Sequence, residues 1–94
     1  IEPRGNGMIL KIITPDQDEI TKNHIDSVNV HLSNGYPISI YPRHIPLAAA
    51  LQAGFINYSE NGIKKKVQIS DGLLMVENDI INCFVSWADA KSDG

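Results

Sequence analysis

The sequence predicts an all-β fold, a flattened antiparallel sandwich of about 8–10 short strands. Apolar and polar residues alternate at a period of two, as in Val28, Val30 and Leu32, which is the pattern of a half-buried strand. Three residue pairs that suit tight hairpins separate such runs: Asn34-Gly35, Asn61-Gly62 and Asn78-Asp79. A chain of 94 residues suffices for one domain with a single core.

The elements follow from this alternation in chain order. The first expected strand is Met8–Thr14, and the others are 28–32, 38–40, 55–58, 63–70, 73–76 and 80–87. Residues 1–7 are Gly- and Pro-rich without periodicity, and predict a disordered arm or a cloning remnant. The domain is expected to span residues 8–89, followed by a tail at 90–94.

The segment 47–53 supports two structures. Its leucines and alanines favour a helix locally, but Pro46 and Gly54 leave room for only about two turns, which is marginal for an independent helix. Consistency with the surrounding sheet favours an extended strand, and we adopt the strand.

The last hairpin is apolar on both faces. Leu73 and Met75 alternate with Leu74 and Val76, and in the next strand two apolar sets again alternate. These sets are Ile81, Cys83, Val85 and Trp87 on one face, and Ile80 and Phe84 on the other. A strand with one solvent-exposed face alternates apolar with polar residues. Because this hairpin is apolar on both faces, we expect a second protein to cover its outer face.

Charge and composition exclude several partners. The net charge of −3 argues against nucleic acid and against an anionic membrane surface. The longest apolar runs fall well short of the ~18 residues of a membrane span, so we expect no direct membrane insertion. The single cysteine, Cys83, suits a reducing compartment.

No residue cluster predicts catalysis, a metal site or a cofactor. His24, His31 and His44 lack the paired spacing of metal ligands, and surface positions explain them better. The closeness of His24, Asp26 and Ser27 in sequence is not the geometry of a catalytic triad. Lys64-Lys65-Lys66 is typical of a solvated strand edge rather than of an anion site. Together with Phe55 and Tyr58 it gives only weak support to a surface that binds single-stranded nucleic acid. We expect a protein that is not an enzyme.

The stretch from Tyr41 to Pro46 is a stiff corner. Pro42 and Pro46 fix φ and remove backbone donors, so Arg43 and His44 project in a defined direction. Such a corner serves either as a contact loop or only to turn the chain, and the residues alone do not decide between the two.

Four sequence motifs, in the same order along the chain, resemble those of one protein family. They are Leu10–Asp16 (Leu-x-Ile-hydrophobic-Thr-Pro-acid), Ser39–Leu47 (with Tyr-Pro-x-His-x-Pro-Leu), Ser70–Val76 and Ala88-Asp89. Together they are similar to the amino-terminal domain of the epsilon subunit of rotary F-type ATP synthases, the mitochondrial delta subunit.

The resemblance implies a non-catalytic rotor subunit in the central stalk, at the cytoplasmic face of a bacterial or archaeal inner membrane. Its partners would be the gamma subunit and the polar loops of the c-ring, and it would help couple ion flow to ATP synthesis or hydrolysis. Uncovered apolar strands predict self-association of the isolated domain without gamma. The residues expected to bind partners are Tyr36, Pro37, Tyr41, Arg43, His44 and Ala49.

The chain departs from the family pattern at the corner. The family usually has an acidic residue where Pro37 stands, and glycines where Ser39 and Arg43 stand. The sign of the charge facing the ring is therefore changed, and partner loops should differ accordingly. The family commonly continues into a two-helix hairpin with inhibitory and ATP-binding roles, and we expect no such hairpin or roles from these residues.

Two other functions compete with the rotor subunit. A stand-alone β-sandwich adaptor would keep the fold and bind a different protein. A small enzyme or ligand-binding sandwich would need a pocket with convergent polar groups, for which the sequence supplies no cluster.

Overall fold

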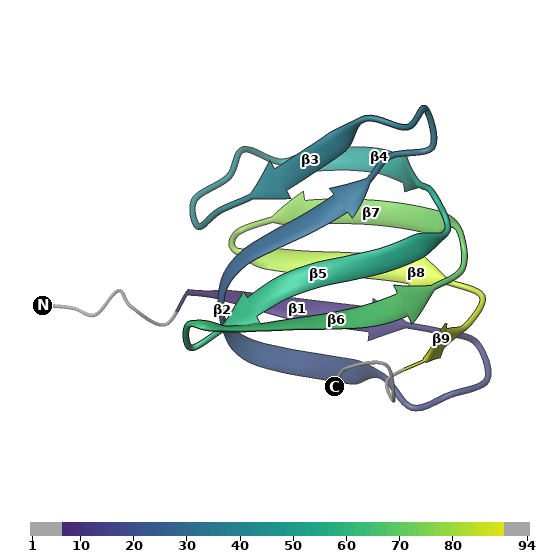
Figure 1. Cartoon of the computed structure of the whole chain (residues 1–94), viewed down its shortest axis with the longest axis horizontal. Helices are drawn as coiled ribbons and strands as arrows, with labels where there is room; N and C mark the ends of the chain where they lie inside the picture. The colour runs from purple at the N-terminus through teal and green to yellow at the C-terminus, as the bar shows by residue number, and fades with distance from the viewer. Residues whose placement is uncertain (1–6, 90–94) are drawn as a thin grey trace, which may run out of the picture.

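The computed structural model describes residues 7–89, so the predictions for residues 1–6 and for the tail at 90–94 lie outside the described residues. Nine strands and no helix occupy the described part (Figure 1). They are β1 (Met8–Ile13), β2 (Ile20–His31), β3 (Pro37–Ile40), β4 (Leu47–Leu51), β5 (Gly54–Glu60), β6 (Ile63–Ile69), β7 (Gly72–Glu77), β8 (Ile80–Val85) and β9 (Ala88–Asp89). The predicted all-β fold is confirmed.

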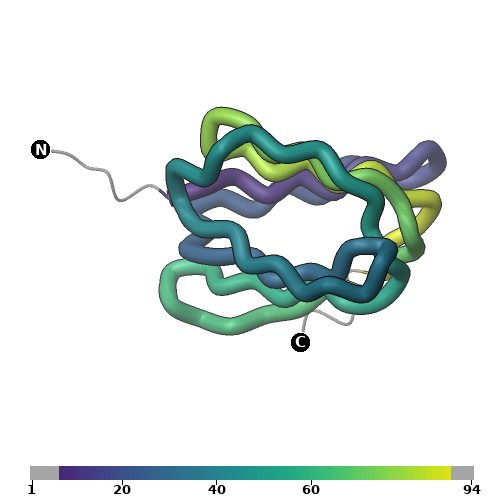
Figure 2. Tube along the Cα trace, turned by 90° about the horizontal axis from the view of Figure 1, so that it is seen from above, coloured from purple at the N-terminus to yellow at the C-terminus, as the bar shows by residue number. Residues whose placement is uncertain are grey.

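The strands form two layers that face each other (Figure 2). Layer 1 has the order β4-β7-β8-β1 and ends on the first half of β2. Layer 2 contains β3, the second half of β2, β5, β6 and β9. β2 belongs to both layers because it bends: its register shifts between Ile25 and Ser27, and His24 has a left-handed φ of 60°.

One strand pair departs from the expected antiparallel pattern. β1 and β8 run parallel, with Ile9 opposite Ile80 and Ile13 opposite Phe84. Every other pair is antiparallel. Because β1 and β8 are separated by almost the whole chain, their pairing closes layer 1 by a long-range contact.

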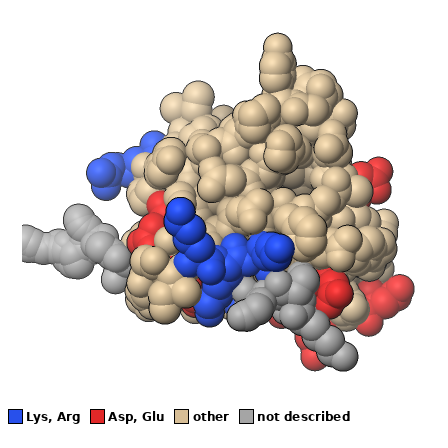
Figure 3. All heavy atoms as spheres, in the orientation of Figure 1, with Lys and Arg blue, Asp and Glu red and all other residues tan. Residues whose placement is uncertain are grey.

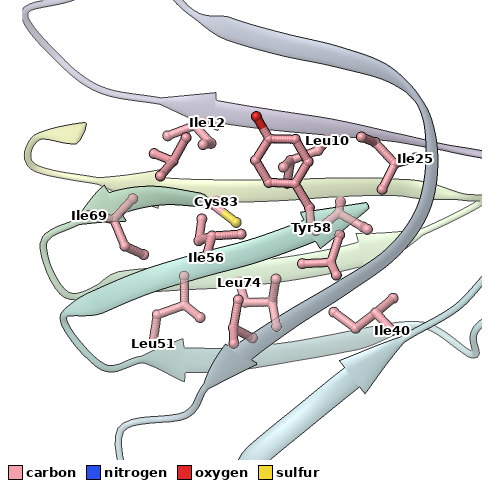
Figure 4. Packing of buried hydrophobic residues seen from close by; sticks show 14 of the residues in the cluster. Leu10, Ile12, Ile25, Ile40, Leu51, Ile56, Tyr58, Ile69, Leu74 and Cys83 are labelled. Carbon is pink, nitrogen blue, oxygen red and sulfur yellow. The ribbon is translucent and has the colours of Figure 1, made fainter. Parts of the chain in front are cut away.

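The core lies between the layers and is built from alternate residues of each strand. Leu10 and Ile12 of β1, Ile56 and Tyr58 of β5, and Leu74 of β7 are all at most 2% exposed (Figure 4). Cys83 is also buried here, and loss of hydration raises the pKa of its thiol to about 12. The core is apolar, and the thiol in it stays protonated at neutral pH.

Two of the three predicted hairpin turns have the expected geometry. Asn61 and Gly62 have φ of 52° and 82°, and Asn78 and Asp79 have 55° and 63°, so both turns place two left-handed residues between paired strands. The turn at Asn34-Gly35 is different, since only Gly35 has a positive φ in that pair and the loop is longer. Its ends are joined by the Leu32 N–H donating to the Tyr36 carbonyl at 2.8 Å.

Residues Leu47–Leu51 form β4, which confirms the strand over the helix. The predicted strand 80–87, with Trp87 on the same face as Val85, is too long. β8 ends at Val85, and the backbone N–H groups of Ser86 and Trp87 donate to Ser70 Oγ at 2.8 and 3.3 Å. This contact turns the chain into β9 and leaves Trp87 45% exposed.

Candidate functional site

The outer surface of layer 1 is mainly apolar, although Lys11, Glu77 and Asn82 also face outward on it. Leu73, Met75 and Phe84 are 55%, 47% and 39% exposed on it, and pairing places Leu73 between Ala50 and Phe84. We call this surface the apolar outer face, and its apolar residues are Ile9, Ile13, Ala48, Ala50, Leu73, Met75, Ile80 and Phe84. The doubly apolar hairpin predicted from the sequence is thus part of a surface to which β1 and β4 also contribute.

Two shallow grooves lie on this side of the molecule. One has a volume of about 410 Å³ and is lined mainly by apolar groups that include Ile13, Pro15 and Phe84. The other has about 290 Å³ and includes Leu47 and Met75. Each groove has one charged residue in its lining, Asp71 or Glu77, so neither presents the convergent polar groups of a catalytic pocket.

The outer surface of layer 2 is polar. It presents exposed Asn, Ser, Lys and Gln side chains, and we call it the polar outer face: Asn29, Ser39, Asn57, Lys64, Lys66 and Gln68. Lys66 Nζ lies 4.6 Å from the centre of the Phe55 ring, and Lys65 pairs with Glu60 at 3.2 Å. Tyr58 is buried, so the aromatic platform considered for nucleic acid is not formed.

Most of the predicted contact residues flank the short edge strand β3. In the described residues β3 pairs only with β2, and Pro37 at its start removes a backbone donor from the edge. Tyr36 precedes β3 and is 69% exposed, while Tyr41 follows it and is 59% exposed. We call residues 36–46 the β3 edge. Ala49 lies outside it, half-buried on β4, in phase with the buried Leu51.

The corner after β3 is held by an acidic side chain from a distant turn. Arg43 has a left-handed φ of 66°, and its backbone N–H donates to Asp79 Oδ1 at 2.6 Å. The Asp79 carbonyl accepts from the Ile9 N–H at 2.9 Å, so Asp79 connects the corner, the β7–β8 turn and the start of β1. His44 Nδ1–H donates to the Ile45 carbonyl at 2.6 Å. The corner has a fixed backbone.

Sequence reasoning did not find Asp79, Ile9 or Ile13. In the sequence Asp79 stands only in a turn pair, and nothing local shows that its carboxylate reaches Arg43. Ile9 and Ile13 carry a usable signal, because two of the three outward residues of β1 are apolar.

The described residues hold no group of three or more His, Cys, Asp or Glu side chains that suits a metal ion. His24 is exposed at the bend of β2, His31 is the exposed last residue of that strand, and His44 lies in the corner. Within residues 7–89 no helix is long and apolar enough to span a membrane.

The sequence profile of the ATP synthase delta/epsilon chain β-sandwich domain matches residues 7–90. The chain belongs to this family. An ATP synthase epsilon chain of Lawsonia intracellularis is 34% identical over 84 residues, which is 89% of this chain and 62% of that protein. The epsilon chain of Halalkalibacterium halodurans is 30% identical over 84 residues with the same two coverages. The chain therefore spans 62% of the length of these epsilon-chain relatives.

Two solved structures share the fold of this delta/epsilon-type domain. A chain of the Euglena gracilis mitochondrial ATP synthase, in a structure of OSCP, F1 and c-ring, matches with a TM-score of 0.77 at 19% identity, over 88% of this chain and 52% of that one. A chain of the Tetrahymena thermophila mitochondrial ATP synthase, in a structure of its central stalk and c-ring, matches with a TM-score of 0.70 at 13% identity. The match covers 89% of this chain and 67% of that one.

Proposed function

We propose that the protein is a non-catalytic central-stalk subunit of an F-type ATP synthase. In this role it links the gamma subunit to the c-ring and helps couple ion flow to ATP synthesis or hydrolysis. The family assignment supports the complex.

The observation that carries the proposal is the apolar outer face. An apolar sheet surface of this kind is costly to leave in water, and large exposed apolar patches mark protein interfaces. A stable docking buries roughly 800 Å² on each partner, which the outer side of a four-strand layer can supply. We assign this face, together with His44 and the adjoining β4, to the gamma subunit.

The β3 edge supplies a second contact. It stands at one end of the sandwich, as the upper rim in Figure 1, and its exposed side chains are mainly aromatic, aliphatic and proline. We assign the segment around Pro37 and the corner at Arg43 to the polar loops of the c-ring. Two contacts on different sides let one rigid body connect two partners, because a stiff sandwich transmits force without rearrangement. The location that follows is the membrane surface, on the cytoplasmic side.

A protein-interaction adaptor outside the ATP synthase is the second candidate. The changed residues at Pro37, Ser39 and Arg43 favour it, because they alter the surface that would face the ring. A neighbouring set of ATP synthase genes in the organism would support the rotor subunit instead.

The test is co-purification of the protein with the gamma and c subunits of its own organism, with Arg43→Gly and His44→Ala as variants. We expect the wild type to bind and both variants to bind more weakly. A folded protein that binds neither subunit would reject the rotor role and favour the adaptor.

A further inference from the structure

We propose that Arg43 determines the specificity of the β3 edge by forming a bidentate ion pair with a carboxylate on the partner. This inference rests on the proposed function and adds to it the chemistry of the partner surface that faces the corner.

Arg43 is the one formal charge in a long uncharged part of the chain. Between Ser27 and Ser59 the sequence contains no Asp, Glu or Lys, and Arg43 is its single arginine. In Figure 3 the surface over the upper part of the molecule, where β3 and the β2–β3 loop lie, is accordingly almost free of charged side chains. In space the Asp79 carboxylate lies at the base of the corner, on the Arg43 backbone, so the guanidinium is the one positively charged group that this segment offers to a partner. Desolvation by a partner strengthens the pairing of such a group with a carboxylate.

The base of the Arg43 side chain is fixed. The prolines at 42 and 46 restrict the corner, and the bond from the Arg43 N–H to Asp79 holds the residue at its φ of 66°. This conformation is unfavourable for a residue with a Cβ. Since glycine would fit the backbone better, the arginine is explained by its side chain, not by the turn.

The guanidinium is available to a partner. The residue is exposed, and no described residue forms an ion pair with its side chain. The nearby Asp79 carboxylate already accepts from the Arg43 backbone through Oδ1. A guanidinium presents paired N–H donors that match the two oxygens of a carboxylate.

The surroundings favour a protein carboxylate over a phosphate polymer or a lipid surface. Nucleic acid and anionic membranes are bound by clusters of cations, whereas this edge has one. Tyr41 and Ile45 beside it are 59% and 74% exposed, and such side chains suit the apolar surroundings of a buried ion pair in a protein interface.

The experiment measures the affinity of the protein for the gamma–c-ring subcomplex of its own organism, at several salt concentrations. The variants are Arg43→Lys, Arg43→Gln and Arg43→Glu, and the matched control is Lys64→Glu on the polar outer face. We expect losses of about 10-fold for Arg43→Gln and about 100-fold for Arg43→Glu, with a smaller loss for Arg43→Lys and a weaker salt dependence in the uncharged variant. Lys64→Glu should stay within about 2-fold of wild type.

A second pair of variants tests whether the fixed backbone of Arg43 matters for binding. Asp79→Asn keeps an acceptor and tolerates a positive φ, whereas Asp79→Gly keeps only the backbone freedom. We expect Asp79→Gly to weaken binding more than Asp79→Asn does. A lysine placed at one acidic residue of the partner should restore binding to Arg43→Glu.

The outcomes separate the two proposals. Wild-type binding that is equally strong in Arg43→Gln and Arg43→Glu would overturn the ion pair and leave the rotor role intact. Absence of wild-type binding, in a protein whose circular dichroism shows the native fold, would overturn both.

Discussion

The two outer faces of the sandwich are built on the same pleated geometry and differ in what they present to solvent. On layer 1 most of the outward positions of β7 and β8 are apolar, with Leu73, Met75 and Phe84 the most exposed of them, and on layer 2 the corresponding positions are held by residues such as Asn57 and Lys66. The two layers share one core, so this difference does not serve the packing of the domain. We therefore place the proposed partner contact on layer 1 and leave layer 2 to solvent.

The largest loss of stability is expected from adding a side-chain carbon where two strands of layer 1 approach each other closely. A Cβ on Gly72 would overlap the carbonyl oxygen of Phe84 and approach Val85 Cγ1 to 2.9 Å. Gly72→Ala should therefore lower the free energy of unfolding by about 3 kcal/mol, because the β7–β8 pair must separate to admit it.

The matched variant is Gly54→Ala at the start of β5 in layer 2. A Cβ there meets nothing within 4 Å, and its φ of 151° adds only backbone strain, so the cost should be about 1 kcal/mol. Urea unfolding measures the free energy of unfolding of both variants. Equal losses of stability would show that β7 and β8 are not as closely paired at Gly72 as described.

A smaller effect, on binding and not on folding, is expected from a charge on each outer face. Leu73→Asp should weaken binding to the gamma subunit by about 30-fold, near 2 kcal/mol, because the carboxylate must be desolvated in an apolar contact. The same substitution should reduce self-association of the isolated protein.

Asn57→Asp places the same charge at the centre of the polar outer face and should leave gamma binding unchanged. Titration calorimetry of both variants gives the comparison. If Asn57→Asp weakened binding as much as Leu73→Asp, the assignment of gamma to layer 1 would be wrong.

The smallest expected effect is on the pH dependence of stability, and it comes from the two sides of β8. Cys83 faces the core while Phe84 next to it faces out, and burial raises the pKa of the thiol from 9.0 to about 12. Above pH 9 the unfolded chain loses this proton while the folded protein keeps it. The stability due to the protonated thiol is therefore complete below pH 9 and is lost progressively as the pH rises toward 12.

Between pH 8 and pH 10 the wild type should lose about 1 kcal/mol more stability than Cys83→Ala, which has no thiol to titrate. Unfolding by urea at the two pH values measures the difference. All other titratable groups are the same in the two proteins, so an identical pH dependence would mean that the thiol is hydrated in the folded state.

Local patterns predicted much of the fold because its hairpins are local. Asn61-Gly62 and Asn78-Asp79 mark turns whose flanking strands pair directly. The alternation of Val28 and Val30 with polar residues marks the buried face of β2. The strand at 47–51 followed from consistency with its neighbours, against its own helix propensity.

The features that were not predicted depend on distant contacts. The first half of β2 contains polar residues such as Asn23 and His24, and it is a strand because it pairs with β1. The parallel pairing of β1 with β8 and the bond from Arg43 to Asp79 join segments far apart in sequence. The proline corner was visible as a stiff turn, but the group that holds it was not. Whether Tyr36, Pro37, Tyr41, Arg43, His44 and Ala49 bind partners stays a prediction.

The bend in β2 has a mechanical consequence. In a sandwich whose layers meet only through side chains, a sideways load can slide one sheet over the other by breaking apolar contacts alone. Here a covalent chain crosses from layer 1 to layer 2, so sliding must also break strand pairing on both sides of the bend. A twist applied at the β3 edge is thus carried by backbone hydrogen bonds into β1 and β8, and the domain resists shear as a single body.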